Sequence, residues 1–142
     1  MNPTPPTIAV FNSSEDTTEM LRAVLQQNGF SSVVTGHIPA IKRGEADFLT
    51  FLEVHDPQVF VWDISIPYES NWRFTQLMMQ LDQMKGRKVL LTTTNKRVLE
   101  SLVGPTDAIE IVGKPYDLDR IVTSVKSAAG IDPKPETASP RT

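Results

Sequence analysis

Short apolar runs alternate along this chain with segments in which apolar residues recur every three or four positions. The apolar runs occupy residues 8–11, 32–34, 59–62, 89–91 and 108–112. Most of them show no alternation of polar and apolar side chains, which is typical of strands that are covered on both faces. We therefore expect five strands in a buried, parallel sheet.

The segments between these runs carry apolar stripes with helical spacing. The stripes predict five helices, around residues 20–25, 41–52, 74–81, 98–102 and 118–125. The first helix should end at Asn28 and Gly29, the last should end near Gly130, and Gly44 interrupts the second. Strands that alternate with helices predict an α/β domain with right-handed crossovers and helices on both faces of the sheet.

Proline-rich, polar segments flank this pattern at both ends. We expect a disordered tail over residues 1–6, one folded domain over residues 7–129 and a second disordered tail over residues 130–142. The 142 residues of the chain are enough for one domain with a core of its own.

Composition narrows the classes of function. A net charge of −3 does not favour binding to nucleic acid or to an anionic membrane. The chain has neither a signal peptide nor an apolar run near the ~20 residues of a membrane span, so we expect a cytoplasmic protein. It has no cysteine, and His37 and His55 stand apart from acidic partners at metal-ligand spacing. No residue pattern supports an enzymatic role beyond self-phosphorylation.

Three polar residues follow apolar runs at the points where strands should end. Asp63 ends the third strand, Thr92 lies 29 positions later at the end of the fourth, and Lys114 lies 22 positions after Thr92 at the end of the fifth. The carboxyl ends of parallel strands meet at one edge of a sheet, which is where such sheets bind ligands. A carboxylate nucleophile, a hydroxyl donor and an ammonium group together suit phosphoryl transfer to the carboxylate.

The same segments resemble the motifs of response-regulator receiver domains. Residues 59–67 look like the phosphoacceptor strand and loop, residues 91–93 look like the switch Thr with its small neighbour, and residues 113–118 look like the Lys-Pro-aromatic motif. The resemblance covers residues 7–129. It implies a flavodoxin-like, doubly wound five-stranded parallel sheet with strand order 2-1-3-4-5.

The resemblance also implies roles and partners. Asp63 would accept a phosphoryl group from a histidine kinase or a phosphotransfer protein, with Thr92 and Lys114 stabilising it. Output would pass to a protein partner, or to a second copy in a homodimer, through the face formed by the fourth helix, fifth strand and fifth helix. The residues expected on that output face are Lys96, Arg97, Glu100, Tyr116 and Arg120.

The chain departs from the receiver pattern at the metal site. Receivers carry two adjacent acidic residues after the first strand, and Asn12 and Ser13 stand at the matching positions here. Asp63 and the backbone carbonyl of Ser65 remain as metal ligands, and Asn12 can reach a metal-bound water through its amide oxygen. Mg²⁺ prefers carboxylates and retained waters, so we expect Mg²⁺ binding to be weak.

Glu15 and Asp16 have two interpretations. They match the acidic first turn of a helix capped by a Ser, and they could alternatively reach in to replace the missing metal ligands. With two acidic groups lost, we also expect a direct ion pair between Asp63 and Lys114 that favours the ionised carboxylate.

Three further departures concern switching and loops. Ile111 holds the position of the switch aromatic and cannot supply the usual rotamer change. Tyr68 to Trp72 form a bulky loop that could cap the site, and residues 37–45 should form an enlarged loop before the second helix.

Two functions therefore stand side by side. The first is a stand-alone receiver that accepts a phosphoryl group on Asp63 and signals through protein contacts. The alternative is a pseudo-receiver, a protein-interaction module that does not depend on phosphorylation. The absent acidic pair and Ile111 favour the alternative, whereas the retained Asp63, Thr92 and Lys114 favour the receiver. A weaker third interpretation is a small-molecule-binding flavodoxin-like domain.

Overall fold

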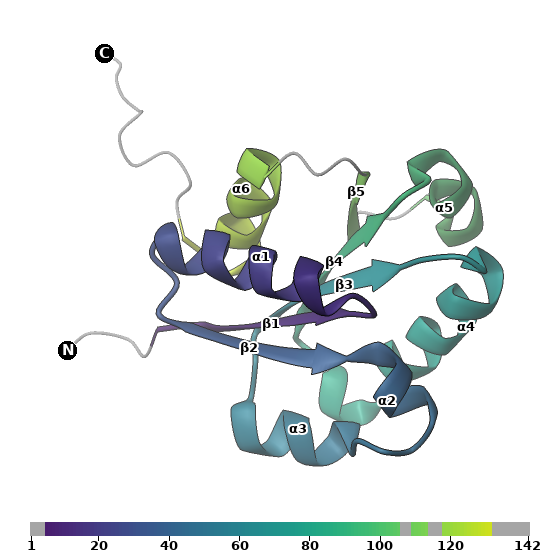
Figure 1. Ribbon diagram of the computed structural model, residues 1–142, viewed down its shortest axis with the longest axis horizontal. Helices are drawn as coiled ribbons and strands as arrows, with labels where there is room; N and C mark the ends of the chain where they lie inside the picture. Colours follow the sequence, from purple (N-terminus) through teal and green to yellow (C-terminus); the bar gives the residue numbers. More distant parts are fainter. Residues whose placement is uncertain (1–4, 106–108, 114–117, 132–142) are drawn as a thin grey trace.

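The fold is a five-stranded parallel sheet between two helical layers, as a computed structural model that describes residues 5–105, 109–113 and 118–131 shows. The strand order is β2-β1-β3-β4-β5, and every pairing is parallel. The strands are β1 (Thr7–Asn12), β2 (Ser32–His37), β3 (Val59–Ile64), β4 (Lys88–Thr93) and β5 (Ile109–Gly113). The arrows of β1, β2 and β3 end at the same edge (Figure 1), and the predicted sheet and strand order are confirmed.

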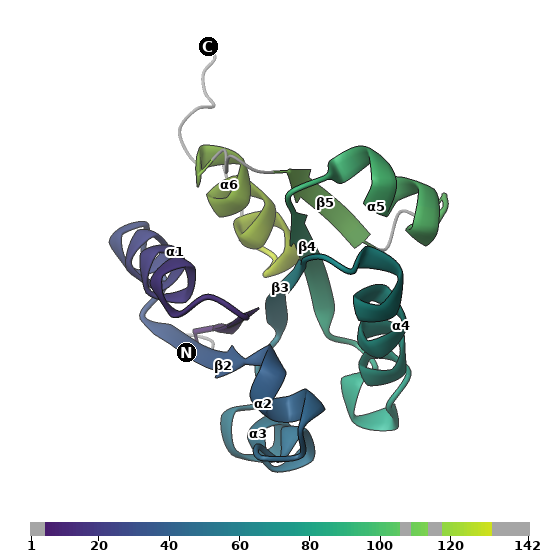
Figure 2. The same ribbon diagram turned by 45° about the vertical axis from the view of Figure 1, so that its right-hand side comes forward.

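Helices cover both faces of the sheet (Figure 2). Helices α1 (Glu15–Gln27) and α6 (Leu118–Ala128) pack on one face through one apolar cluster. The other face is covered by α2 (Ile38–Lys42), α3 (Phe48–His55), α4 (Tyr68–Met79), α5 (Lys96–Val103) and a 3-10 turn at Asp82–Met84. No helix in the described ranges is long and apolar enough to cross a membrane. Most of both predicted tails, residues 1–4 and 132–142, lies outside the described residues.

Two sequence-based expectations were wrong. The enlarged loop predicted at residues 37–45 contains helix α2, because Pro39 favours a first helical turn and Ile38 is buried against the core. The predicted interruption of the second helix at Gly44 is confirmed: Gly44 adopts a left-handed conformation with φ of +76°, and Asp47 caps α3, so two separate helices lie on either side of it. The capping loop predicted at Tyr68 to Trp72 is instead the start of helix α4.

An aromatic cluster lies under α3 on the second face. Trp62 is 2% exposed, and its ring stacks on Phe11 with centroids 5.0 Å apart. Phe48 of α3 meets Trp62 edge to face at 5.9 Å. Each such pair contributes about 0.5–1.5 kcal/mol beyond the burial of its area. Because Trp62 is held in this cluster, the position of the next residue on β3, Asp63, is also restrained.

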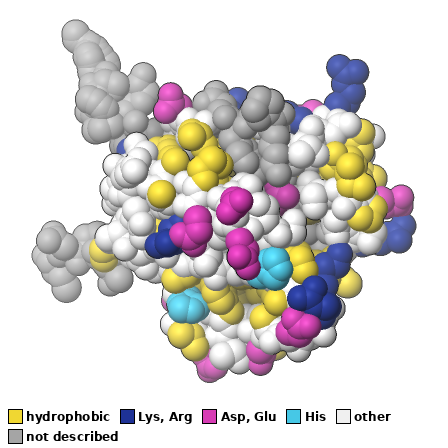
Figure 3. All heavy atoms as spheres, viewed as in Figure 1, with side chains coloured by type: hydrophobic (Ala, Val, Ile, Leu, Met, Phe, Trp, Pro, Cys, Tyr) yellow, Lys and Arg dark blue, Asp and Glu magenta, His cyan; other side chains and the backbone are white. Residues whose placement is uncertain are grey.

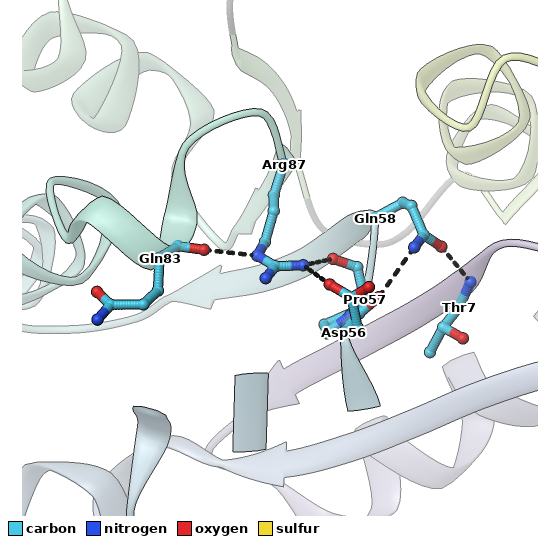
Figure 4. A network of polar contacts seen from close by, with 6 residues as sticks. All are labelled: Thr7, Asp56, Pro57, Gln58, Gln83 and Arg87. Atoms are coloured by element: carbon cyan, nitrogen blue, oxygen red, sulfur yellow. Dashed lines mark hydrogen bonds and ion pairs between the residues drawn. The ribbon is translucent and has the colours of Figure 1, made fainter. Parts of the chain in front are cut away.

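A polar network ties the amino ends of the strands together, at the opposite edge from Asp63 (Figure 4). The guanidinium of Arg87 donates to the carbonyls of Gln83 and Pro57, at 2.8 and 2.7 Å, and to the Asp56 carboxylate. Gln58 accepts from the Thr7 backbone N–H. The network anchors the segments that lead into β3 and β4, and so keeps the two strands in register.

Candidate functional site

Asp63 and Thr92 meet at the carboxyl edge of the sheet. They are direct partners in the register of β3 and β4, so both side chains leave the sheet on the same side. The Thr92 hydroxyl donates to Asp63 Oδ1 at 2.7 Å. Asp63 is 5% exposed and Thr92 is 0% exposed, so the bond lies in a largely desolvated setting. The structure brings together these two residues of the predicted site, and their chemical roles stay predictions.

The third residue of the predicted set, Lys114, lies outside the described residues. Strand β5 ends one residue earlier, at Gly113, which pairs with Thr93 of β4. The expected ion pair between Asp63 and Lys114 therefore stays a prediction.

Asn12 and Ser13 follow β1 at the position expected for metal ligands. Asn12 is 1% exposed, and its Oδ1 already accepts a hydrogen bond from the Ser14 backbone N–H at 2.9 Å. Its Nδ2 is buried and has no hydrogen-bond partner among the described residues. The free group of this amide is therefore a donor, whereas a cation would need an acceptor.

Glu15 and Asp16 form the exposed first turn of α1, whose N-cap Ser14 accepts from the Thr17 backbone N–H at 3.2 Å. This geometry agrees with the helix-start interpretation. Within the described ranges, no group of three His, Asp or Glu side chains is placed to hold a metal ion.

The Ser65 carbonyl, the other expected metal ligand, is already engaged. Asn71 of α4 donates from Nδ2 to the Ser65 carbonyl at 2.8 Å. The Oδ1 of Asn71 accepts in turn from the Lys42 ammonium of α2. Sequence analysis missed both Lys42 and Asn71. The one hint in the sequence is the absence of the acidic pair, which suggests that other residues take part in the site.

These residues do not fit Mg²⁺. The hard cation needs several oxygen ligands in near-octahedral geometry, preferably with more than one carboxylate. Asp63 is the only carboxylate that lines the site among the described residues, and the Asn12 amide oxygen and the Ser65 carbonyl each already accept one hydrogen bond, from Ser14 and Asn71. The described part of the site thus has the donors of an anion site and few ligands for a metal ion.

A pocket of about 400 Å³ opens beside Asp63. Its wall includes Ser13, Lys42, Arg43, Trp62 and Asn71. Basic and acidic side chains lie together over the α2 corner of the molecule (Figure 3). Arg43 donates two hydrogen bonds to the Glu45 carboxylate, which raise the pKa of Arg43 and hold the pKa of Glu45 below its usual value.

The bulky residues after Asp63 do not cover this pocket. Trp72 is buried in the core, and the Tyr68 hydroxyl is hydrogen-bonded to Thr94 at 2.5 Å, beyond the end of β4. The walls of the pocket are therefore formed by α2, the end of β3 and α4, without a cap from Tyr68 or Trp72.

The expected output face lies around α5. Lys96, Arg97 and Glu100 are exposed on α5, and Arg120 is exposed on α6, whereas Tyr116 lies outside the described residues. Ile111 is buried on β5 and packs in the same apolar cluster as the second helical layer.

Known structures share this fold. The chemotaxis protein CheY4 of Vibrio cholerae superposes with a TM-score of 0.64 at 19% identity, over 88% of this chain and 99% of that one. A pilus assembly-related protein of Burkholderia pseudomallei gives 0.61 at 14% identity, over 89% and 90%. An atypical orphan response regulator, described as having a phosphorylation-independent regulatory mechanism, gives 0.58 at 12% identity, over 87% and 95%.

The chain therefore has the CheY-like receiver fold, and the recognition made from its motifs is confirmed at the level of the fold. No protein-family model matches the sequence. No curated protein matches it either.

Proposed function

We propose that this chain is a signalling receiver module in which Asp63 accepts a phosphoryl group from a histidine kinase or a phosphotransfer protein. The observation that carries the proposal is the hydrogen bond from Thr92 to Asp63 at the carboxyl edge of the sheet. A buried carboxylate is costly, and retaining one that is bonded to a buried hydroxyl is hard to explain by packing alone. The likeness to receiver structures supports the same conclusion.

The transfer needs few groups. An Asp63 carboxylate oxygen attacks the phosphorus of a phosphohistidine, the P–N bond breaks, and the imidazole leaves with the electron pair. The Thr92 hydroxyl then turns from Asp63 Oδ1 to a phosphoryl oxygen, which is a stronger acceptor. Lys114, if it reaches the same edge, would offset the added negative charge.

Output would proceed through protein contacts at the face formed by α5, β5 and α6. Ile111 cannot perform an aromatic rotamer change, so the usual side-chain relay is missing. A movement of Thr92 would instead pass along β4 to the neighbouring strand β5. Lys96, Arg97, Glu100 and Arg120 give this face a mixed, exposed charge pattern that suits a charged protein surface or a second copy of the chain.

A phosphorylation-independent interaction module is the second candidate. The specific observation that favours it is the poor set of metal ligands, in which the Ser65 carbonyl already accepts from Asn71 and the Asn12 amide oxygen already accepts from Ser14. One structure of similar shape is described as a phosphorylation-independent regulator.

Incubation with a small phosphodonor, read by intact mass, separates the two candidates. We expect the wild type to gain the mass of one phosphoryl group and Asp63→Asn to gain none. Asp82→Asn, which changes an exposed carboxylate in the 3-10 turn, is the matched control and should behave like the wild type. A wild type that stays unmodified with every donor and in both the presence and absence of Mg²⁺ would support the interaction module instead.

A further inference from the structure

A lysine side chain, Lys42, lines the same pocket as the candidate acceptor Asp63. The Lys42 ammonium donates to Asn71 Oδ1, and Asn71 Nδ2 donates to the Ser65 carbonyl at 2.8 Å. Ser65 lies two positions after Asp63, and Lys42, Asn71 and Asp63 line the same pocket. This chain of hydrogen bonds links a cation of α2 to the loop of the acceptor carboxylate.

We infer that Lys42 is the built-in cation of this site and replaces the divalent metal, so that the site works without Mg²⁺. The inference rests on the proposed function for the phosphoryl-transfer part alone. That the site rejects Mg²⁺ is a separate claim about binding.

The charges of the site support this assignment. Arg43 is neutralised by two hydrogen bonds to Glu45, but no carboxylate of the described residues lies within ion-pair distance of Lys42. Lys42 therefore contributes an unneutralised positive charge to the pocket wall. A divalent cation there would be repelled by this charge while finding Asp63 as the only lining carboxylate in the described chain. A phosphoryl group would be attracted by the same charge.

The hydrogen-bonding groups point to the same conclusion. The buried Asn12 Nδ2 lacks a partner among the described residues and can donate to a phosphoryl oxygen, whereas it can give nothing to a metal ion. The Ser65 carbonyl has its partner in Asn71. That bond uses one of the two lone pairs of the carbonyl, so the carbonyl is a poorer metal ligand than a free one.

Helix α2 explains how Lys42 is held. Ile38 buries its side chain in the core and Pro39 fixes the first turn, so the short helix has a defined position at the end of β2. The Lys42 ammonium lies 5.5 Å from the centroid of the Phe74 ring, which adds a cation–π contact. Together with the bond to Asn71, this contact restrains a side chain that would otherwise sample many rotamers.

A Mg²⁺ titration, followed by the fluorescence of Trp62 in the pocket wall, tests the binding claim. The wild type should show no saturable response at millimolar Mg²⁺. Restoring the carboxylates in Asn12→Asp with Ser13→Asp should give weak binding while Lys42 remains, and adding Lys42→Gln should tighten it at least about tenfold by removing a facing charge. The triple variant also proves that the fluorescence can report binding.

Two results of the titration would overturn the inference. One is saturable Mg²⁺ binding by the wild type. The other is equal Mg²⁺ affinity of the acidic variants with and without Lys42. Circular dichroism of each variant checks that the fold is kept. Isothermal titration calorimetry of the wild type detects Mg²⁺ binding without a fluorescence control, so the wild-type result stands even if a variant does not fold.

Phosphorylation by acetyl phosphate tests the claim that phosphoryl transfer to Asp63 works without Mg²⁺. Asp63 attacks the phosphorus, the P–O bond breaks and acetate leaves. We expect the rate in EDTA and in Mg²⁺ to agree within about twofold, which is too little for the loss of a catalytic metal ion. Lys42→Gln should slow the reaction about tenfold because one cation near the transferred group is lost, while Lys85→Gln, at an exposed lysine of the opposite edge, should not.

The outcomes separate the inference from the proposed function. Phosphorylation that requires Mg²⁺ would overturn the role of Lys42 while supporting Asp63 as the acceptor. No phosphorylation under either condition would contradict the acceptor role, and the Mg²⁺ titration would still decide whether Lys42 excludes the metal.

Discussion

Asp63 and Thr92 share a hydrogen bond that depends on the register of β3 against β4. A shift of one strand by one residue would turn its side chains to the other face, so Asp63 and Thr92 would lie on opposite faces of the sheet. The bond is buried, so each of its partners constrains the other more strongly than at a surface. Among the described residues, the site combines the carboxylate of Asp63, the hydroxyl of Thr92 and the cation of Lys42, which lines the same pocket as Asp63.

Replacing Thr92 by Val tests the role of this hydroxyl. The substitution keeps the shape but removes a donor to a buried carboxylate, so we expect a loss of about 1–3 kcal/mol in the free energy of unfolding. Phosphoryl transfer to Asp63 should also slow. Thr93→Val is the matched control for transfer, because Thr93 is equally buried on the same strand and its hydroxyl accepts from the Asn95 N–H instead of bonding Asp63. Equal rates of transfer in the two variants would contradict the assignment.

Among the elements, helices were harder to predict than strands. The five strands follow from apolar runs that need no partner to be recognised. The stretch from His37 to His55 was expected to be one loop and one helix, and it forms two helices because burial of Ile38 stabilises a five-residue helix that is too short to be stable alone. The start of α4 was mistaken for a loop because its first turn lacks a side-chain cap.

Helix α3 carries a titratable cap, which gives a pH-dependent prediction. Asp47 accepts from the Thr50 hydroxyl and from the backbone N–H groups of Thr50 and Leu49, and these bonds hold its pKa below the usual value. A lowered pKa means that the stabilisation is present above the pKa of the unfolded chain, about 3.9, and is lost as the pH falls through the folded value.

Urea unfolding of the wild type and Asp47→Asn at several pH values provides the measurement. The wild type should be the more stable near neutral pH, and its advantage should vanish below the folded pKa of Asp47, because Asn does not titrate. A difference between the two proteins that is constant from neutral to acidic pH would show that the charge of the cap contributes nothing.

An aromatic cluster around Phe11 connects two strands and a helix. Phe11 contacts Trp62, Phe48 and Phe51, and so connects β1, β3 and α3. Gly36 of β2 lies directly against the Phe11 ring, where a Cβ atom would collide with it. The packing of β1 against β2 therefore requires a residue without a side chain at Gly36. Through Phe11 and Trp62, this packing also affects the position of Asp63.

Gly36→Ala should expose this dependence. Phe11 is buried and cannot move without disturbing its aromatic neighbours, so we expect a cost of about 1–3 kcal/mol in the free energy of unfolding. Gly113→Ala, where a Cβ atom would make only an ordinary contact with Lys96, is the control and should cost less. Thermal unfolding of the two variants measures the difference, and equal midpoints would show that the Phe11 ring adapts freely.

The sequence by itself determined the five strands, the α/β class and the meeting of Asp63 with Thr92. These follow from patterns within single strands and from the rule that parallel strands end at one edge. The tertiary structure alone decided that Lys42 and Asn71 meet beside the Ser65 carbonyl. Lys42 and Asn71 are 29 positions apart on two helices, and their contact depends on how α2 packs beside α4. No periodicity encodes that packing, because it results from the combined burial of side chains from several elements.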